Sequence, residues 1–495
     1  MRSRQDSFRI HKIRRTYDRE QGKFSFNISY STAVALTPRT TAVAEAFGLG
    51  VDEELKFPVL DVELKIGPTD IIYVTGDSGS GKSVLLRAIK KDLADDAIDV
   101  ADIQVDLQKP LIETVGSTVE EGLELLSRVG LNDAFLFLRS FDQLSDGQKY
   151  RYRIAKLLES RARFWILDEF AATLDRDTAK VVAFNLQKCA RQQGKAVLAA
   201  TTHMDLFEDL SPSVYVHKRF GKEITVNYHP NIPPAECSLV KEMRVEEGSM
   251  TDWRALAGFH YRSHSVPAPR KVFVLKRGLE LCGVIVYSYP AVTCFGRRLM
   301  LPKMGMKELN EKVSNISRIV VHPKYRTIGL GSKLIKETLS LAGTEYVEMS
   351  AVMAKYNPFA EKAGMVKVVV QEPPKEAVKV LQVLEKLGFD RELLGSSRHI
   401  AETLEGLSQS QVAELKSTFA RFRHTRFSKS FSYHLPYGTV EMYRRQIQGA
   451  SLEKLAHLIR ICGFLLQSKV YLFWASESDN SSVRRRIGKE KCERA

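Results

Sequence analysis

Two glycine-rich segments of this chain carry residue types that bind phosphate groups. The first, Gly76-Asp77-Ser78-Gly79-Ser80-Gly81-Lys82-Ser83, directly follows the apolar run Ile71–Val74. The second, Arg326-Thr327-Ile328-Gly329-Leu330-Gly331-Ser332, follows the strand-like run Ile316–Val321. A strand that feeds a glycine-rich turn and then a helix directs backbone N–H groups and the positive helix end at a phosphate. The sequence therefore predicts two phosphate-binding loops.

The first segment has the spacing G-x-x-x-x-G-K-[ST], which is typical of a loop that binds a nucleoside triphosphate. There Lys82 would reach the β and γ phosphates, and the Ser83 hydroxyl would bind Mg²⁺. A second element, the apolar run Phe164–Leu167, ends in Asp168 and Glu169. Asp168 suits the Mg²⁺ shell and Glu169 could polarise the attacking water. A core strand with a solvated acidic end is the alternative interpretation.

Between these elements stands Leu144-Ser145-Asp146-Gly147-Gln148, and with it the chain resembles the ATP-binding cassette (ABC) ATPases. The signature of that family is leucine-serine-glycine-glycine-glutamine. Gln108 resembles the glutamine of the Q-loop, Ala172–Asp175 resembles the D-loop, and His203 resembles the switch histidine. Gln104 is a rival for the Q-loop position, but a proline follows Gln108 closely, as in the family.

The resemblance implies a binding site for ATP and Mg²⁺. The residues that it assigns to ATP are Gly76, Asp77, Ser78, Gly79, Ser80, Gly81, Lys82, Ser83, Gln108, Ser145, Gly147 and Gln148. Those that it assigns to the metal ion are Ser83, Gln108 and Asp168, and those assigned to hydrolysis are Glu169 and His203. The adenine-stacking aromatic residue is not identified, because Phe57 is a candidate but could equally be a core residue.

In these ATPases the signature of one domain closes on the phosphate loop of another. The chain carries one copy of each motif, so the resemblance implies a homodimer formed through the ATPase domain. Asp146 departs from the family signature by placing a carboxylate near the neighbour's triphosphate. Repulsion there would weaken binding unless Lys149 or Arg151 compensates.

The second loop fits the pattern [QR]-x-x-G-x-[GA], and residues 240–370 resemble the GCN5-related N-acetyltransferases (GNAT). Gly329 and Gly331 let the backbone wrap a pyrophosphate, while the amides of the loop donate at the start of a helix expected over Lys333–Leu341. The resemblance implies that acetyl-CoA is bound by the whole loop together with two flanking residues. These residues are Val321, Arg326, Thr327, Ile328, Gly329, Leu330, Gly331, Ser332 and Asn357.

The chemistry of acetyl transfer is less clearly marked. The GNAT family often has a tyrosine that protonates the departing CoA thiolate, but the matching position here is Ala360. Tyr356 is our candidate for that catalytic role, with water or no side chain as alternatives. Glu348 and His322 could deprotonate an amine, although both could equally be structural.

The elements that must position these loops alternate between strand and helix over residues 71–230, which is typical of a wound α/β sheet. Proline-rich breaks at Asn231–Pro234 and Gln371–Pro374 mark boundaries. We therefore expect an α/β protein with three parts. These are a P-loop ABC-type ATPase domain with an N-terminal extension over 1–232, a GNAT α/β domain over 238–372, and a mainly helical basic C-terminal region over 373–495.

The composition is that of a globular protein with excess positive charge, since 27% of residues are charged and the formal net charge is +15. Such an excess favours polyanions, above all nucleic acid. Arg421–Tyr433 alternates cations with aromatics, which suits phosphate neutralisation and base stacking, although a solvated helix with core phenylalanines fits equally.

We expect no membrane partner, because no apolar run approaches the roughly 18–20 residues of a membrane span. The six cysteines form no C-x-x-C pair and no secretory h-region is visible, which predicts a cytoplasmic protein with reduced thiols.

Together these features predict an enzyme whose ABC ATPase gates or powers acetyl transfer from acetyl-CoA to a macromolecule, preferably RNA. One alternative is a protein acetyltransferase with a regulatory ATPase. Another is a nucleic-acid-remodelling ABC ATPase with a non-catalytic GNAT module. A transporter subunit is the least favoured.

Overall fold

The structure is a computed structural model that describes residues 8–32, 36–48, 55–260, 265–352, 354, 357–422 and 439–476. Tyr356, residues 423–433 of the basic-aromatic segment and the side chain of Phe57 lie outside this description. The chain divides into two compact units, which are described separately. Unit 1 comprises 1–264, 272–285 and 319–334, and unit 2 comprises 265–271, 286–318 and 335–495.

The first half of the chain mixes helices and strands, which agrees with the α/β class predicted for residues 71–230. The strands are β1 (Phe8–Asp18), β2 (Lys23–Thr32), β3 (Leu55–Lys65), β4 (Ile71–Thr75), β5 (Ala97–Asp99), β6 (Phe164–Leu167), β7 (Ala196–Ala200), β8 (Val214–Lys218), β9 (Ile224–Tyr228) and β10 (Arg244–Glu247). The helices are α1 (Pro38–Ala46), α2 (Lys82–Leu93), α3 (Val119–Arg128), α4 (Ala134–Phe137), α5 (Asp146–Leu158), α6 (Arg176–Gln193), α7 (Phe207–Leu210), α8 (Ser238–Lys241) and α9 (Met250–Leu256).

The second half begins with strands and ends mostly in helices. The strands are β11 (Pro269–Arg277), β12 (Glu280–Ser288), β13 (Val313–Val321), β14 (Tyr346–Ala351), β15 (Val366–Gln371) and β16 (Lys469–Ala475). The helices are α10 (Arg297–Met300), α11 (Met306–Lys312), α12 (Leu330–Thr338), α13 (Phe359–Lys362), α14 (Lys375–Lys386), α15 (Ser397–Glu405), α16 (Gln409–Arg421), α18 (Val440–Gln448) and α19 (Leu452–Leu465).

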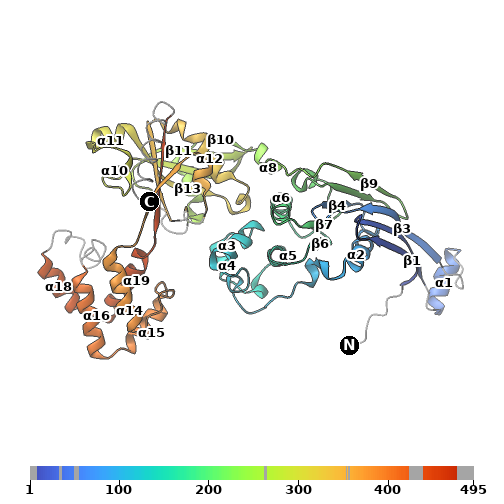
Figure 1. The fold of residues 1–495 in the computed structure, drawn as a ribbon, viewed down its shortest axis with the longest axis horizontal. Coiled ribbons are helices and arrows are strands. Elements are labelled where there is room, and N and C mark those ends of the chain that lie inside the picture. Colours follow the sequence, from blue (N-terminus) through green and yellow to red (C-terminus); the bar gives the residue numbers. More distant parts are fainter. Residues whose placement is uncertain are drawn as a thin grey trace. The chain divides into compact units, whose positions relative to one another are not determined.

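A six-stranded sheet in unit 1 organises the first candidate site (Figure 1). Its order is β5-β6-β7-β4-β8-β9, and all neighbours are parallel except β8 and β9. Strands β4, β6 and β7 are buried along their whole length. A parallel sheet buries its strands in this way when both faces are covered. The carboxyl ends of β4, β6, β7 and β8 therefore meet at one edge of the sheet.

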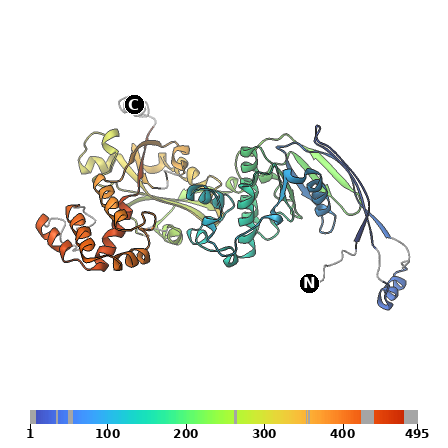
Figure 2. The same ribbon diagram turned by 60° about the horizontal axis from the view of Figure 1, so that its bottom comes forward.

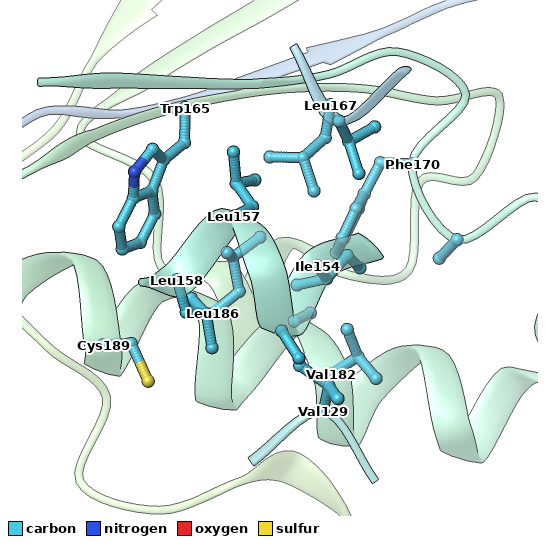
Figure 3. Packing of buried hydrophobic residues seen from close by; sticks show 14 of the residues in the cluster. Val129, Ile154, Leu157, Leu158, Trp165, Leu167, Phe170, Val182, Leu186 and Cys189 are labelled. Carbon is cyan, nitrogen blue, oxygen red and sulfur yellow. The ribbon is translucent and has the colours of Figure 1, made fainter. Parts of the chain in front are cut away.

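Successive residues of these strands point to opposite faces and so feed two separate cores. Trp165 and Leu167 of β6 pack against α5 and α6 in one core, together with Phe170 (Figure 3). Phe164 and Ile166 of the same strand belong to the other core, which contains α2 and strands β2 and β3. These uninterrupted apolar runs determine the residue at which each strand ends.

An antiparallel three-stranded sheet, ordered β1-β2-β3, precedes the six-stranded sheet. Helix α1 connects β2 to β3 at the end of this ribbon (Figure 2). Phe24 and Phe26 of β2 are buried in the core shared with α2. The strand-like N-terminal segment thus forms one wall of the ATPase part.

A second, seven-stranded sheet has the order β10-β11-β12-β13-β14-β16-β15. Strands β13 and β14 are parallel and pair over only three residues, Val313 to Asn315. Strand β16 lies between β14 and β15 and is antiparallel to both. The C-terminal region expected over 373–495 therefore contributes a strand to this sheet as well as helices.

Helices α14, α15, α16, α18 and α19 gather in one bundle within unit 2 (Figure 2). Its core contains Leu384, Phe389, Leu415, Phe419 and Leu458, all almost fully buried. Throughout the part of the chain that is described, no helix combines the length and apolarity that crossing a membrane requires.

Candidate functional site

The phosphate loop between β4 and α2 depends on glycine backbone conformations. Gly76, Gly79 and Gly81 all have positive φ angles, of 140°, 77° and 102°. A Cβ atom at Gly76 would lie 1.9 Å from the carbonyl oxygen of Lys218, at the end of the neighbouring strand β8. The close approach of these two backbones leaves no room for a side chain at residue 76.

Polar groups inside this loop suit a triphosphate. The Lys82 ammonium donates to the carbonyl oxygens of Gly76 and Asp77, each at 2.7 Å. Burial lowers the pKa of Lys82, against the opposing charges of Asp168, Asp77 and Glu169. The Ser80 hydroxyl is buried and has no hydrogen-bond partner among the described residues. An unpaired buried hydroxyl beside a lysine that can turn outward fits an anionic ligand.

The two acids predicted after β6 lie near this lysine, as their effect on its pKa indicates. Glu169 is exposed and has a φ of +52°, which is unusual for a residue with a side chain. Its N–H donates to Asp168 Oδ1 at 3.1 Å. The next N–H, from Phe170, donates to Ala200 at the end of β7 at 2.7 Å. The strand ends therefore hold the strained backbone of Glu169.

His203 follows β7 at the same edge of the sheet. Its N–H donates to the Thr201 hydroxyl at 3.2 Å, and its carbonyl accepts from the Tyr73 hydroxyl of β4. Burial, followed by the charge of Arg176, lowers the pKa of His203. The imidazole is therefore neutral at pH 7.

Ser145 in the signature-like segment is the N-cap of α5. Its side chain accepts from the Gln148 N–H, while the Gln148 side chain accepts from the Ser145 N–H at 3.0 Å. A Cβ atom at Gly147 would lie 3.1 Å from the carbonyl oxygen of Thr173, so the signature packs on the D-loop-like segment. Arg151 donates to the carbonyl oxygens of Gly147 and Gly130, so its guanidinium stabilises backbone.

Neither glutamine proposed for the Q-loop has a side-chain environment that singles it out. Gln108 is exposed in a turn held by the Asp106 carboxylate, and the Gln104 side chain donates to a backbone carbonyl. Sequence reasoning missed Asp99, which ends β5 beside β6. Burial raises the pKa of Asp99, with a contribution from Asp168. No local signal marked Asp99, because only Ala97 and Ile98 precede it after two further aspartates.

Ser83 lies in the first turn of α2, directly after Lys82. In the described parts of the chain, no three or more His, Cys, Asp or Glu side chains are placed to hold a metal ion. Mg²⁺ that arrives with a nucleotide needs only one or two protein ligands besides phosphate oxygens and water. Ser83 and Asp168, which come from adjacent parts of one edge, fit that smaller requirement.

The second glycine-rich loop leads into α12, but this helix spans Leu330–Thr338 and not Lys333–Leu341 as expected, so the last three residues of the loop belong to the helix. Thr327 and Gly329 have φ angles of +73° and +91°, and nothing lies within 4 Å of the position of a Cβ at Gly329. The Arg326 guanidinium donates to the carbonyl oxygens of Val321 at 3.0 Å and of Asn132 at 2.6 Å. The arginine predicted to contact a pyrophosphate thus donates to the chain itself.

The residues considered for acetyl transfer have structural partners. Glu348 is buried and accepts from Arg297 Nε at 2.9 Å, from Arg297 Nη2 at 2.5 Å and from the Tyr471 hydroxyl at 2.9 Å. His322 Nδ1 accepts from the Lys324 N–H at 3.3 Å. Asn357 is exposed. Glu348 therefore forms a buried ion pair, which does not suit a free general base.

Known proteins match the part of the chain that carries the first site. A family model described as ABC transporter matches residues 59–172. The cytochrome c biogenesis ATP-binding export protein CcmA of Gluconobacter oxydans is 30% identical over 166 residues, which cover 30% of this chain and 75% of that protein. The methionine import ATP-binding protein MetN of Rhizobium etli is 27% identical over 229 residues, or 38% of this chain.

The chain spans 63% of the length of this MetN protein. Among solved structures, a dimeric ATP-binding cassette bound to ADP and phosphate is 21% identical, with a TM-score of 0.31. That match covers 36% of this chain and 93% of the other.

Proposed function

This chain belongs to the ABC transporter family of ATP-binding proteins, and from that membership we propose that it is an ATP hydrolase. One observation carries the proposal. The phosphate loop after β4, the acids after β6 and His203 after β7 all follow strands that end at one edge of a parallel sheet. The charges of Asp168 and Glu169 act on Lys82, so groups from separate strands form one site.

Each group in this site has a role that follows from its chemistry. Lys82 and the loop amides would hold the phosphates, because they offer donors at a helix N-terminus. Ser83 and Asp168, with Gln108 as the remaining candidate, would hold Mg²⁺, which supplies charge neutralisation on the phosphates when it is bound. Glu169 is exposed and would orient the attacking water, and neutral His203 would hydrogen-bond at the γ position.

The same proposal includes a homodimer. The signature-like segment Ser145–Gln148 lies at the N-terminus of a 13-residue helix, where its N–H groups favour an anion. Each chain carries one copy of each motif. The simplest arrangement is therefore a dimer in which the signature of each chain faces the phosphate loop of the other. Asp146 stands in the first turn of α5, and Arg151 is engaged by carbonyl oxygens, so Lys149 is the remaining cation that could compensate its charge.

Two variants test ATP hydrolysis. Lys82→Ala should weaken ATP binding, whereas Glu169→Gln should bind ATP with unchanged affinity and stall turnover in a dimer. Phosphate release and ATP affinity are measured side by side, with the molar mass from light scattering. Unaltered turnover of Glu169→Gln would show that the assigned acid is wrong.

Acetyl transfer is the second candidate function, and a specific feature of the second sheet favours it. Strands β13 and β14 pair over only three residues, and β13 then leads to the loop with two left-handed residues before α12. A parallel pair that stops early leaves backbone groups for an extended ligand such as pantetheine. We propose that acetyl-CoA binds there, through Val321, the loop Arg326–Ser332 and Asn357.

Calorimetry with acetyl-CoA tests this candidate directly. Gly329→Glu would place a carboxylate where a pyrophosphate must lie, and should abolish acetyl-CoA binding while it spares ATP binding. If the unaltered protein binds no acetyl-CoA, the alternative of a nucleic-acid-remodelling ATPase takes its place.

The acceptor that we propose is RNA in the cytoplasm, and the net charge of +15 supports a polyanion. Labelled acetyl transfer to RNA and to protein, measured in parallel, separates this proposal from the protein acetyltransferase. The import and export roles in the relatives' names remain a further alternative. Co-purification with a membrane protein in place of RNA would favour it.

A further inference from the structure

A charged cluster within unit 1 joins the start of α6 to residues of β11 and of the turn after β13. The Asp177 carboxylate accepts from Lys324 at 2.6 Å and pairs with Arg277 at 2.8 Å. The Tyr325 hydroxyl lies 3.1 Å from the same carboxylate and 2.8 Å from the carboxylate of Glu280, to which it donates the shorter hydrogen bond. Asp177 is the second residue of α6, and all five residues belong to unit 1.

The cluster is partly shielded from water, which makes its ion pairs stronger than surface pairs. The side chain of Asp177 is 14% exposed, that of Arg277 25% and that of Lys324 30%. Burial works to raise the pKa of Asp177, but hydrogen bonds from Lys324 and Arg277 outweigh it and hold that pKa below its usual value. Glu242 also pairs with Arg277, at 2.6 Å.

Lys324 also reaches the residue that begins α6. Asp175 is the N-cap of this helix, since its side chain accepts from the Thr178 N–H at 3.1 Å, and its carboxylate lies 3.8 Å from the Lys324 ammonium. Asp175 and Asp177 are like charges two residues apart. Lys324 offsets their repulsion at the point where the helix starts.

Asp175 also ends the short segment that begins with the candidate catalytic acid, Glu169. Two tight turns hold this segment, in which Ala172 N–H donates to Glu169 and Leu174 N–H donates to Ala171, each at 3.1 Å. The segment is therefore fixed at one end by β6 and at the other by the cap of α6. These turns connect the Asp175 cap to Glu169 through a short, hydrogen-bonded stretch of backbone.

Two further contacts tie the second glycine-rich loop to the same unit. The Asn185 side chain, on α6, donates to the Thr327 hydroxyl at 2.9 Å. Arg326 donates to the Asn132 carbonyl at 2.6 Å. The turn that carries Lys324 is thus held on α6 through Thr327 and on the segment before α4 through Arg326.

We propose that Lys324 and Arg277 are positioning residues for ATP hydrolysis. They hold the start of α6, and through Asp175 they set the position of the segment that carries Glu169. This inference rests on the proposed ATPase function. It also gives a part in hydrolysis to residues that lie 108 and 155 positions after Glu169 in the chain.

Lys324→Met is the first test. It removes the shared cation, and kcat for ATP should fall about tenfold, because misplacement of a catalytic group by roughly 1 Å can cost up to about 100-fold. The Kd for ATP should stay unchanged, since the phosphate loop is not touched. Lys324→Arg keeps the charge and should restore most of the rate.

A double-mutant cycle adds a measurement that a general loss of structure would not reproduce. Asp177→Asn should lower kcat to the same extent, and Lys324→Met combined with Asp177→Asn should be no worse than either alone. Lys241→Met is the matched control, because it removes a lysine that forms an exposed ion pair with Glu208. Its kcat should equal that of the unaltered protein.

Several outcomes would overturn the inference. They are a kcat within twofold of normal for Lys324→Met, strictly multiplicative effects in the cycle, or a Kd for ATP that rises in step with the loss of rate. A thermal melt confirms that each variant is folded. If the parent protein hydrolyses no ATP, the proposed function itself fails. If the parent protein is active and the variants have normal rates, only the positioning role fails.

Discussion

Replacing Gly76 by alanine should damage the phosphate loop more than the same change at Gly79, because only Gly76 meets a rigid neighbour. The alanine Cβ at residue 76 would lie 1.9 Å from the Lys218 carbonyl oxygen and 2.9 Å from its carbon. An ordinary carbon–oxygen contact is about 3.3 Å or longer, so the two backbones must separate by about 1.4 Å. Lys218 ends β8, which pairs on both sides, and so the phosphate loop has to move.

The magnitude follows from this displacement. A φ of +140° costs about 1–3 kcal/mol for a residue with a side chain, and overpacking adds about 1–3 kcal/mol. About 2.7 kcal/mol of this cost, when the ATP-bound loop bears it, corresponds to a loss of about 100-fold in affinity. Gly76→Ala should therefore raise the Kd for ATP by about 100-fold and lower the melting temperature.

Gly79→Ala is the matched control, because it shares the left-handed backbone without the collision. Its nearest atom, on the Phe220 ring, would be 3.9 Å from the new Cβ, an ordinary contact. The remaining cost of about 1–2 kcal/mol corresponds to at most about a 30-fold effect on affinity. Gly81→Ala should fall between the two, since its collision at 2.7 Å is with the Val59 side chain, which can rotate.

Calorimetric titration with ATP and Mg²⁺, together with thermal unfolding, measures the three variants. The reasoning fails if Gly79→Ala weakens ATP binding as much as Gly76→Ala does, or if Gly76→Ala binds within threefold of the unaltered protein. Either result would mean that the β8 backbone does not constrain the loop.

Three further predictions concern charged groups. Arg297→Met should destabilise the protein by about 3–5 kcal/mol in chemical denaturation, because it leaves the Glu348 carboxylate buried without its partner. Adding Glu348→Met to the same chain should recover most of the lost stability. Arg176→Met removes a charge that lowers the pKa of His203, so the acidic limb of the rate–pH profile should move to higher pH. An unchanged limb would show that the titration of His203 does not cause it. The pKa of Asp177 in the folded protein lies below its ordinary value of 3.8, so its contribution to stability is fully present above that pH and is lost as pH falls through the lower value. Asp177→Asn should therefore flatten the profile of stability against pH below about pH 4. Denaturation at each pH measures this profile.

The two glycine-rich loops differ in how much the structure adds to their motifs. In the first, the glycine conformations, the unpaired Ser80 hydroxyl and the nearby acids all suit a triphosphate. In the second, the glycine geometry is present, but Arg326 donates to two carbonyl oxygens of the chain. Binding of acetyl-CoA through this arginine would require those bonds to exchange, which is why calorimetry decides that proposal.

The local features of the first site could be predicted from neighbouring residues alone. Glycine at residues 76, 79 and 81 and lysine at 82 are needed for reasons of backbone conformation and charge that operate within eight residues. The apolar runs that became β4 and β6 are short and uniformly buried, so the strands and the groups directly after them could be located from hydrophobicity alone.

Contacts between segments that are distant in the chain could be known only from the folded structure. Strand β16 lies between β14 and β15, although a whole helical bundle precedes it in the chain. Asp177 is held by Arg277 and Lys324, and Gly76 is restricted by the backbone of Lys218. No local pattern records such pairs, because their energy depends on distances that exist only after the chain has folded.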